Sequence, residues 1–391
     1  MISFLDSQKI IKEVAGALAP STEKIALRNL ENRILAEDIF SAENIPSFDN
    51  SLMDGFAVNS SETPGKFIVG EALEIMTGAP MPIDKKYDAV ARVEDCKKIT
   101  EGDKCFIEIE VKLTARENVR FAGTDMRKGD RVLSKGIRLN TSHIMALASI
   151  GKSHIQVYKK PRIAVLSTGS ELVDFSVEEL PQGKIRNSSQ AYIMNTLEAM
   201  GCEAVSFGIL RDDTEKFKKF LFEVEKGFDL VITTGAVSMG KYDFVREILE
   251  EQGGEVFFHR VAVRPGKPIL FAKLKTGCAF FGLPGNPISS VFGLQFFLKT
   301  FFQAMFGMLP GPQVFALNTE EKAKPSGLTC FFRARATVGD DAVLRVKIHP
   351  NQASNAVSPQ IESNAWTILP EQMESVAKGA RVQVVLNGEL S

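Results

Sequence analysis

From residue 161 to residue 254 the sequence alternates between short apolar runs and amphipathic runs, with glycines between them. The apolar runs at 162–166, 204–210 and 230–232 have the length and the composition of buried strands. Apolar residues recur at helical spacing between these runs, for example at Phe217, Leu221 and Val224. Strands that alternate with helices form a parallel, doubly wound sheet. We therefore expect residues 161–309 to fold as an α/β domain.

Polar and glycine residues follow the predicted strands at their carboxyl ends. Gly169, Ser170 and Glu171 follow the first strand, Asp212 follows the second, and Gly235 follows the third. Parallel sheets bind ligands at this edge, where free backbone N–H groups and helix dipoles attract anions. The pattern predicts a phosphate site, although glycines that only make tight turns would look the same.

The stretch from Gly235 to Lys241 matches a phosphate-binding P-loop up to its last position. Tyr242 stands where that motif needs a Ser or Thr hydroxyl to bind magnesium. A P-loop NTPase is therefore excluded.

The rest of the chain predicts further domains. Ile10, Val14 and Leu18 have helical spacing, so residues 1–42 are expected to be mostly helical. Residues 1–45 plus 137–160 would form a helical N-terminal domain, with a second helix at 144–150 capped by Thr141. Short apolar runs separated by turns predict a β-rich inserted domain at 46–136 and a barrel-like C-terminal β domain at 313–391.

Composition narrows the class of protein. A net charge of −1 over 391 residues argues against a general nucleic-acid binder. Five scattered cysteines without a CxxC pair suit the reducing cytoplasm, and the first residues lack the features of a signal peptide. The apolar stretch 288–308 contains Gln295, Lys299 and Gln303, so we expect a buried helix and no membrane association.

Several motifs together resemble the molybdopterin molybdenumtransferase family, which is related to the E domain of gephyrin. They are FDNSLMDGFAV at 48–58, MTGAP at 76–80, GTD at 123–125, STGSEL at 167–172, RDD at 211–213, TGAVSMG at 234–240, PGKP at 265–268 and LPGNP at 283–287. Each motif is weak by itself, but their order and separation are specific. The first two distinguish this family from molybdopterin adenylyltransferases, which share only the α/β domain.

The resemblance implies an enzyme of molybdenum cofactor biosynthesis. It would insert molybdate into the dithiolene of adenylylated molybdopterin and release AMP, assisted by Mg²⁺. A homodimer is implied, with the substrate between the α/β domain and the partner subunit's β-rich insertion. Molybdopterin adenylyltransferase and molybdoenzyme maturation factors are further expected partners.

The same resemblance assigns roles to individual residues. Catalytic roles fall to Asp54, Thr77, Asp125, Glu171, Asp212 and Asp243. Three of these carboxylates, Asp54, Glu171 and Asp243, would bind the metal. Substrate contacts fall to Gly169, Ser170, Gly235, Ser238, Gly240, Arg264, Lys267, Pro284, Gly285, Pro287, Ser289, Arg335 and Ser354.

Several of these roles have a plainer alternative. Turn or loop formation would explain Asp54, Thr77 and Asp125. Helix capping would explain Asp212, Asp243 and Ser289. A solvated charge would explain Lys267, and Arg335 and Ser354 fall where the match to the family is loose.

Four of the motifs or segments depart from the family pattern. Arg264 replaces a lysine, Ala236 replaces a glycine, Asn187 replaces an aspartate, and Phe121-Ala122 replaces part of an arginine-rich run. None of these changes removes a carboxylate proposed to bind metal. Two other functions remain as alternatives: a molybdopterin adenylyltransferase, or a non-catalytic scaffold with the same fold.

Overall fold

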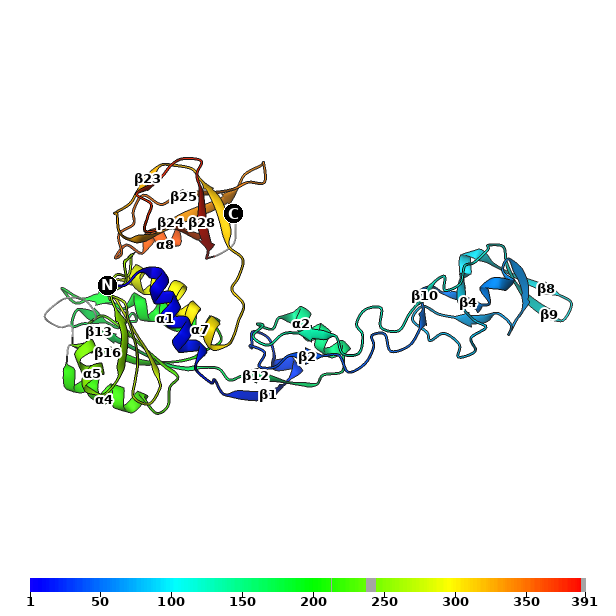
Figure 1. The fold of residues 1–391 in the computed structure, drawn as a ribbon, viewed down its shortest axis with the longest axis horizontal. Coiled ribbons are helices and arrows are strands. Elements are labelled where there is room, and N and C mark those ends of the chain that lie inside the picture. The colour runs from blue at the N-terminus through cyan, green and yellow to red at the C-terminus, as the bar shows by residue number, and fades with distance from the viewer. Residues whose placement is uncertain (212, 237–243, 388–391) are drawn as a thin grey trace. The chain divides into compact units, whose positions relative to one another are not determined.

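The computed structural model describes residues 1–211, 213–236 and 244–387 (Figure 1). The chain forms two compact units. The first contains Met1–Glu23, Asn32–Ile34 and Val157–Ser391, and the second contains Lys24–Glu31 and Leu35–Gln156. The chain passes from one unit to the other through β1 (Thr22–Ala26) and β12 (His154–Tyr158), which pair as a small sheet.

Helix α1 (Phe4–Gly16) begins at the cap residue Ser3, whose hydroxyl accepts a hydrogen bond from the Asp6 N–H. The expectation that residues 1–42 are mostly helical is wrong beyond this helix. After Pro20 the chain forms β1, a 3₁₀ turn (Leu27–Asn29) and β2 (Ile39–Phe40). Proline lacks the N–H that an interior helical position needs, and the strands after it gain partners distant in sequence.

The second unit contains the expected β-rich region. Strand β4 (Gly55–Val58) lies between β6 (Leu73–Ile75) and β7 (Ala89–Arg92), and β9 (Lys104–Ile109) lies between β5 (Gly65–Ile68) and β8 (Cys96–Glu101). The smaller pairs are β3 (Asn50–Ser51) with β10 (Val119–Arg120), and β2 with β11 (Arg131–Leu133). Val58, Phe67 and Ile107 belong to the core that these strands bury.

Helix α2 (Thr141–Ser149) lies close to the predicted segment, but its cap differs from the prediction. The Asn140 side chain accepts the His143 N–H, and the His143 ring accepts the Asn140 N–H. Thr141 is therefore the first helical residue rather than the cap.

The first unit is built on a six-stranded sheet with the order β16-β13-β17-β21-β20-β18. Its strands are β16 (Glu203–Leu210), β13 (Arg162–Thr168), β17 (Leu230–Thr234), β21 (Ala279–Leu283), β20 (Leu270–Lys273) and β18 (Glu255–His259). The predicted doubly wound architecture is confirmed, but the sheet is mixed. β20 and β18 are antiparallel to their neighbours. Only residues 274–278 connect β20 to β21, which is too short for the crossover that a parallel pair needs.

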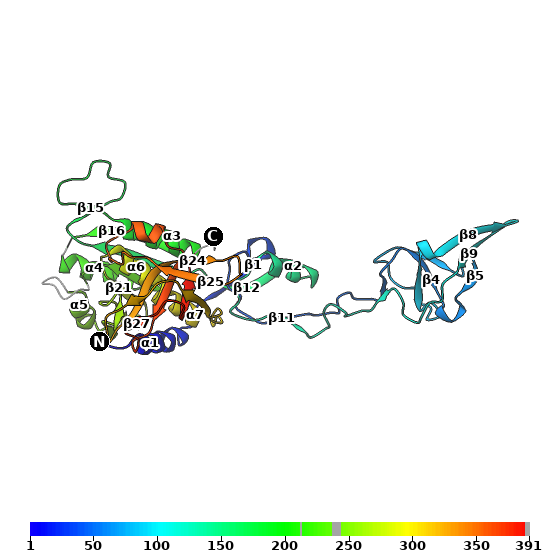
Figure 2. The ribbon, with the colours of Figure 1, turned by 90° about the horizontal axis from the view of Figure 1, so that it is seen from above.

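Helices cover both faces of this sheet. Phe217 of α4 (Thr214–Val224) and Leu249 of α5 (Val245–Glu251) pack with Phe280 on one face. On the other face Phe271 and Phe281 stack, and both contact Phe301 of α7 (Lys299–Met305). α1 packs on α7, and α3 (Ser188–Ala199) packs on α6 (Pro287–Gly293) (Figure 2).

A π-helical segment (Leu294–Leu298) joins α6 to α7, so the apolar stretch near residue 300 is helical and buried, as predicted. Among the helices described, none is long and apolar enough to cross a membrane.

The tail closes into a β-barrel, as predicted. Its strands pair in the cycle β24 (Thr329–Val338), β25 (Leu344–Ile348), β22 (Val314–Asn318), β28 (Arg381–Leu386) and β26 (Ala365–Leu369), which returns to β24. The barrel is fastened to the α/β part by β19 (Val263–Arg264), which pairs with β24. Shorter elements are β14 (Leu172–Val173), β15 (Ile185–Arg186), β23 (Lys322–Ala323), β27 (Ser375–Val376) and α8 (Ser358–Ile361).

Candidate active site

Glycines at the carboxyl ends of neighbouring parallel strands approach one another closely. The Gly235 N–H donates to the Leu283 carbonyl at 3.0 Å, and Thr168 Oγ1 donates to the Thr234 carbonyl at 3.0 Å. A Cβ on Gly235 would lie 2.3 Å from the Thr168 carbonyl oxygen, and one on Gly285 would lie 3.7 Å from the Gly235 Cα. Only glycine fits at Gly235, where φ is +86°. The structure thus brings the predicted Gly235 and Gly285 together at one strand edge.

Glu171 lies at the same edge, after β13. A Cβ on Gly169 would lie 2.8 Å from both Glu171 carboxylate oxygens, so the carboxylate is folded back over this glycine. Lys184 Nζ donates to the Ser170 carbonyl at 2.6 Å and orders the loop. The Glu171 side chain is exposed, and no hydrogen bond to its carboxylate is found in the part of the chain that the structure describes. The carboxylate is therefore available to a ligand.

The segment that carries Arg264 and Lys267 packs on α6. A Cβ on Gly266 would lie 2.4 Å from the Phe292 ring, which shows how closely this turn approaches the helix. Arg264 and Lys267 are both exposed, so their cationic groups can reach an anion in solution.

At the start of α6, Pro287 occupies the first turn and Ser289 is buried. The Ser289 N–H donates to the Asn286 carbonyl at 3.0 Å, and Ser290 Oγ donates to the Pro284 carbonyl at 3.0 Å. These bonds hold the Pro284–Asn286 turn against the helix.

The barrel reaches this turn through Ser354. Asn286 Nδ2 donates to Ser354 Oγ at 3.0 Å, and the Ile288 N–H donates to the Ser354 carbonyl at 3.1 Å. The tail residue whose sequence match was loose therefore lies beside the predicted anion site. Asn286, which the sequence analysis did not select, makes this connection.

Arg335 does not make these contacts. It is exposed on β24, where its Nη1 donates to the Glu362 carbonyl at 3.5 Å. Arg333 on the same strand is only 1% exposed, and burial lowers its pKa. Its guanidinium donates to the carbonyls of Asn351, Ala353 and Ala356 at 3.1, 3.0 and 2.7 Å. Sequence reasoning missed Arg333, although a cation within the run Phe331-Phe332-Arg333-Ala334 is a signal of partial burial.

The second unit brings Asp54 and Thr77 together. The Thr77 N–H donates to Asp54 Oδ1 at 2.6 Å. This backbone bond and the Thr77 side chain lower the pKa of Asp54, so its exposed carboxylate is charged at neutral pH. A Cβ on Gly55 would lie 1.8 Å from the Ala91 carbonyl oxygen, so the residue after Asp54 must be glycine. The motifs at 48–58 and 76–80 therefore form one surface.

Asp125 lies in a neighbouring loop of the same unit. Its N–H donates to the Ile45 carbonyl at 3.0 Å, and its side chain is exposed. The Asp49 carboxylate accepts the Ala122 N–H at 2.8 Å, which fixes the loop where the family's arginine-rich run is shortened.

Asp212, Ser238, Gly240 and Asp243 lie outside the described residues. Helix capping is the plainer explanation for Asp212 and Asp243, but the cap residue of α4 is Asp213 and that of α5 is Phe244. The structure also describes two of the departures from the family. Ala236 has a left-handed backbone with φ of +51°, which the usual glycine adopts more easily, and Asn187 is buried as the cap of α3.

The expected magnesium ligands do not gather within one unit. Asp54 belongs to the second unit, Glu171 to the first, and Asp243 is not described. Within residues 1–211, 213–236 and 244–387, no three His, Cys, Asp or Glu side chains could hold a metal ion together.

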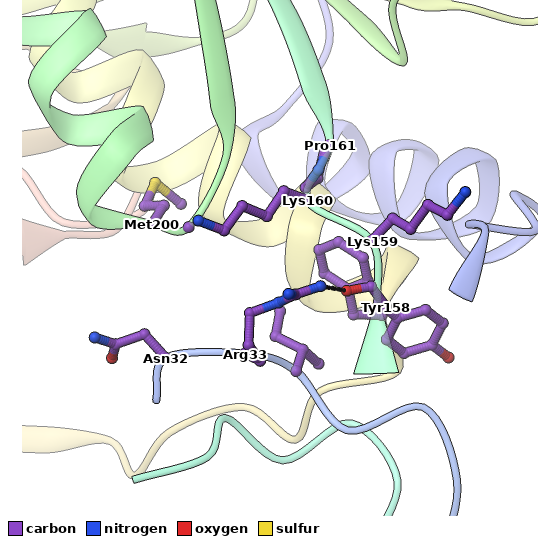
Figure 3. A pocket seen from close by; sticks show the side chains of 10 residues that line it. Asn32, Arg33, Tyr158, Lys159, Lys160, Pro161 and Met200 are labelled. Atoms are coloured by element: carbon purple, nitrogen blue, oxygen red, sulfur yellow. Dashed lines mark hydrogen bonds between the residues drawn. The ribbon is translucent and has the colours of Figure 1, made fainter. Parts of the chain in front are cut away.

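A separate pocket of the first unit contains none of the predicted site residues. It is lined by Asn32, Arg33, Ile34, Tyr158, Lys159, Lys160, Pro161, Met200, Gly201 and Phe306 (Figure 3). The Arg33 guanidinium already donates to the Tyr158 carbonyl and to Glu23, so it is not a free anion ligand.

Comparison with known proteins identifies the family. Residues 2–151 match the MoeA N-terminal region (domain I and II), residues 164–304 match a probable molybdopterin binding domain, and residues 316–386 match the MoeA C-terminal region (domain IV). The molybdopterin molybdenumtransferase of Synechococcus elongatus is 34% identical, covering 98% of this chain and 99% of the relative. That of Haemophilus influenzae is also 34% identical, over 93% of each chain.

Among solved structures, the molybdopterin biosynthesis MoeA protein of Pyrococcus horikoshii has a TM-score of 0.82 at 26% identity, covering 100% of both chains. The α/β fold and the three matched regions define a molybdopterin-binding transferase of molybdenum cofactor biosynthesis. The chain belongs to the MoeA family of molybdopterin molybdenumtransferases.

Proposed function

We propose that the protein transfers molybdenum from molybdate to the dithiolene of adenylylated molybdopterin and releases AMP. The observation that carries the proposal is that Gly235 and Gly285 lie close together at one strand edge, and that the residue after Gly285, Asn286, contacts Ser354 of the barrel. Glycines, which lack a Cβ, let the phosphates of the nucleotide approach the backbone closely at such an edge. Arg264 and Lys267 lie in the segment that packs on α6, and their positive charges suit a small dianion.

We assign the residues as follows. Gly169, Ser170 and Gly235 would approach the substrate through their backbone, and Glu171 would face the phosphoanhydride. Arg264 and Lys267 would hold molybdate, with Ser289, Ser354 and the turn at Pro284–Pro287 completing the pocket. Positioning and electrostatics suffice for ligand exchange at molybdenum, so no covalent nucleophile is needed. Mg²⁺ would accompany the phosphates, which are hard oxygen ligands.

A turnover assay with adenylylated molybdopterin and molybdate tests this function. Release of AMP together with molybdenum cofactor is expected. Consumption of ATP with release of pyrophosphate would instead identify an adenylyltransferase, and no turnover of either kind would favour a scaffold.

We also propose a homodimer in which Asp54, Thr77 and Asp125 of one subunit complete the site of the other. Four large apolar side chains in the motifs that carry Asp54 and Thr77, or next to them, are exposed: Phe48, Leu52, Met53 and Met76 are each 41–58% exposed. A clustered exposed apolar surface favours association with another protein surface. The adenylyltransferase and molybdoenzyme maturation factors remain proposed partners in the cytoplasm, where the five free cysteines would stay reduced.

Sedimentation velocity at micromolar concentration is expected to show a dimer. Met76→Glu should shift the protein towards monomer, because a buried charge without a partner opposes association. Val338→Glu is the matched control, since Val338 is similarly exposed on the barrel. A wild-type monomer would contradict the proposed dimer.

Lys267→Ala is expected to raise the molybdate concentration for half-maximal rate roughly tenfold to hundredfold, because losing one charge-assisted bond costs about 1.5–3 kcal/mol. The larger pterin nucleotide spreads its contacts and should bind almost as before. The measurement is insertion rate against molybdate concentration at saturating pterin.

Lys267→Gln separates charge from bulk in the same assay, and excess molybdate should partly restore its rate. Lys273→Ala, which removes a partly buried lysine of β20 paired with Glu255, is the control. If Lys267→Ala weakened only pterin binding, Lys267 would contact phosphate and the molybdate pocket would lie elsewhere.

A further inference from the structure

The segment from residue 349 to residue 362, which we name the barrel loop, leaves β25 and returns after α8. Its two ends are joined by His349 and Glu362, with Nε2 and Oε2 3.0 Å apart. The His349 side chain is 18% exposed and the Glu362 side chain 63%. The loop is therefore closed by a side-chain bond between its first and last residues.

Both ring nitrogens of His349 make contacts. Nδ1 lies 3.0 Å from the backbone nitrogen of Asn351 and 3.1 Å from its carbonyl oxygen. Nε2 faces the Glu362 carboxylate, and because a carboxylate accepts hydrogen bonds, Nε2 is the donor of this bond. His349 thus connects the first turn of the barrel loop to its last residue.

Other contacts hold the interior of the loop to β24. Arg333 binds three of its carbonyls, as described above. The Arg333 N–H also donates to Gln352 Oε1 at 3.0 Å, and Gln352 Nε2 donates back to the Arg333 carbonyl at 2.9 Å. Ser354 projects from this anchored segment to Asn286 and Ile288. Ser354 therefore lies within the loop that the His349–Glu362 bond closes.

We propose that His349 and Glu362 are a positioning pair for the oxyanion substrate. The pair closes the barrel loop and holds Ser354 against the start of α6, so that the anion pocket is formed before molybdate arrives. Neither residue touches substrate. This inference rests on the proposed function, because it deepens the assignment of the molybdate pocket.

The kinetic test uses the full chain. His349→Ala and Glu362→Ala should each raise the molybdate concentration for half-maximal rate roughly two- to fivefold, the range expected for one partly exposed pair. The rate at saturating molybdate should stay near wild type, because excess anion compensates for a loose pocket. The double variant should be no worse than either single one, since both remove the same bond.

Two further variants separate positioning from general stability. Glu362→Gln keeps an acceptor for the His349 N–H and should restore most of the affinity. Glu320→Ala breaks the Lys347–Glu320 pair of 2.8 Å on the same barrel, outside the loop, and should leave half-saturation unchanged. Additive effects in the double variant, or wild-type half-saturation in both single variants, would overturn the proposal.

Hydrogen–deuterium exchange without substrates separates failure of this inference from failure of the proposed function. Faster exchange is expected in both alanine variants for the barrel loop and for the peptide containing Ile288, whose N–H bonds the Ser354 carbonyl. Glu320→Ala should exchange as wild type does. Unchanged exchange in the alanine variants would overturn the closure itself. If the wild-type protein inserted no molybdenum, the proposed function would be contradicted, whatever the exchange experiment shows.

Discussion

Asp54→Ala and Glu171→Ala are each expected to fold normally and to lose at least about a hundredfold in the rate of molybdenum insertion. Both carboxylates are exposed, and both lie at glycine turns in regions where the site is proposed. The backbone N–H of Thr77 lowers the pKa of Asp54, which therefore carries its charge throughout the neutral range. Removing either charge leaves the developing charges of the transition state without a fixed partner.

Asp54→Asn distinguishes charge from hydrogen bonding, because an amide oxygen can still accept the Thr77 N–H. We expect it to be nearly as slow as Asp54→Ala. Asp84→Asn is the matched control: Asp84 is an exposed aspartate of the same unit whose carboxylate accepts the Lys86 N–H at 3.1 Å. Single-turnover rates with purified substrates give the comparison. Wild-type rates for both Asp54→Ala and Glu171→Ala would contradict the catalytic roles assigned to these two carboxylates.

Arg333→Leu is expected to destabilise the barrel by about 3 kcal/mol. It removes the donors to three partly buried carbonyls. A buried acceptor left without a partner costs roughly 1–3 kcal/mol, and water reaching the exposed residues Asn351 and Ala353 would recover part of this cost. Arg333→Lys should recover little, because one ammonium group cannot reproduce the planar fork of a guanidinium.

Urea unfolding followed by tryptophan fluorescence measures this loss directly. Trp366 is the only tryptophan, it is buried in the barrel, and it pairs with Arg333 across β24 and β26. The signal therefore reports the barrel even if other parts unfold separately. Arg335→Leu, an exposed change two residues away, should alter stability by less than about 0.5 kcal/mol. Equal midpoints for Arg333→Leu and Arg335→Leu would contradict the structural role of Arg333.

Local patterns were enough to predict the α/β core. The apolar runs before Gly169 and Gly235 and the helical spacing of Phe217 and Leu221 depend on neighbours within a few residues, and the structure has these elements. The same reasoning failed after Gly16, because β1 pairs with β12, a strand more than a hundred residues later in the sequence. It also missed the reversal of β20, which is antiparallel to both of its neighbours, β18 and β21.

The sequence by itself determined the family, the doubly wound fold and the motifs that supply the site, because periodicity, glycines and motif order are local or linear properties. Tertiary structure decided which motifs meet. Thr77 binds Asp54 from 23 positions away, and Ser354 reaches Asn286 across 68 positions. It also decided that Arg333, and not Arg335, is buried. Both side chains leave the same face of β24, and only Arg333 is covered by the carbonyls at 351–356. Burial depends on what packs against a residue, and that partner is not visible in the residue's own neighbourhood.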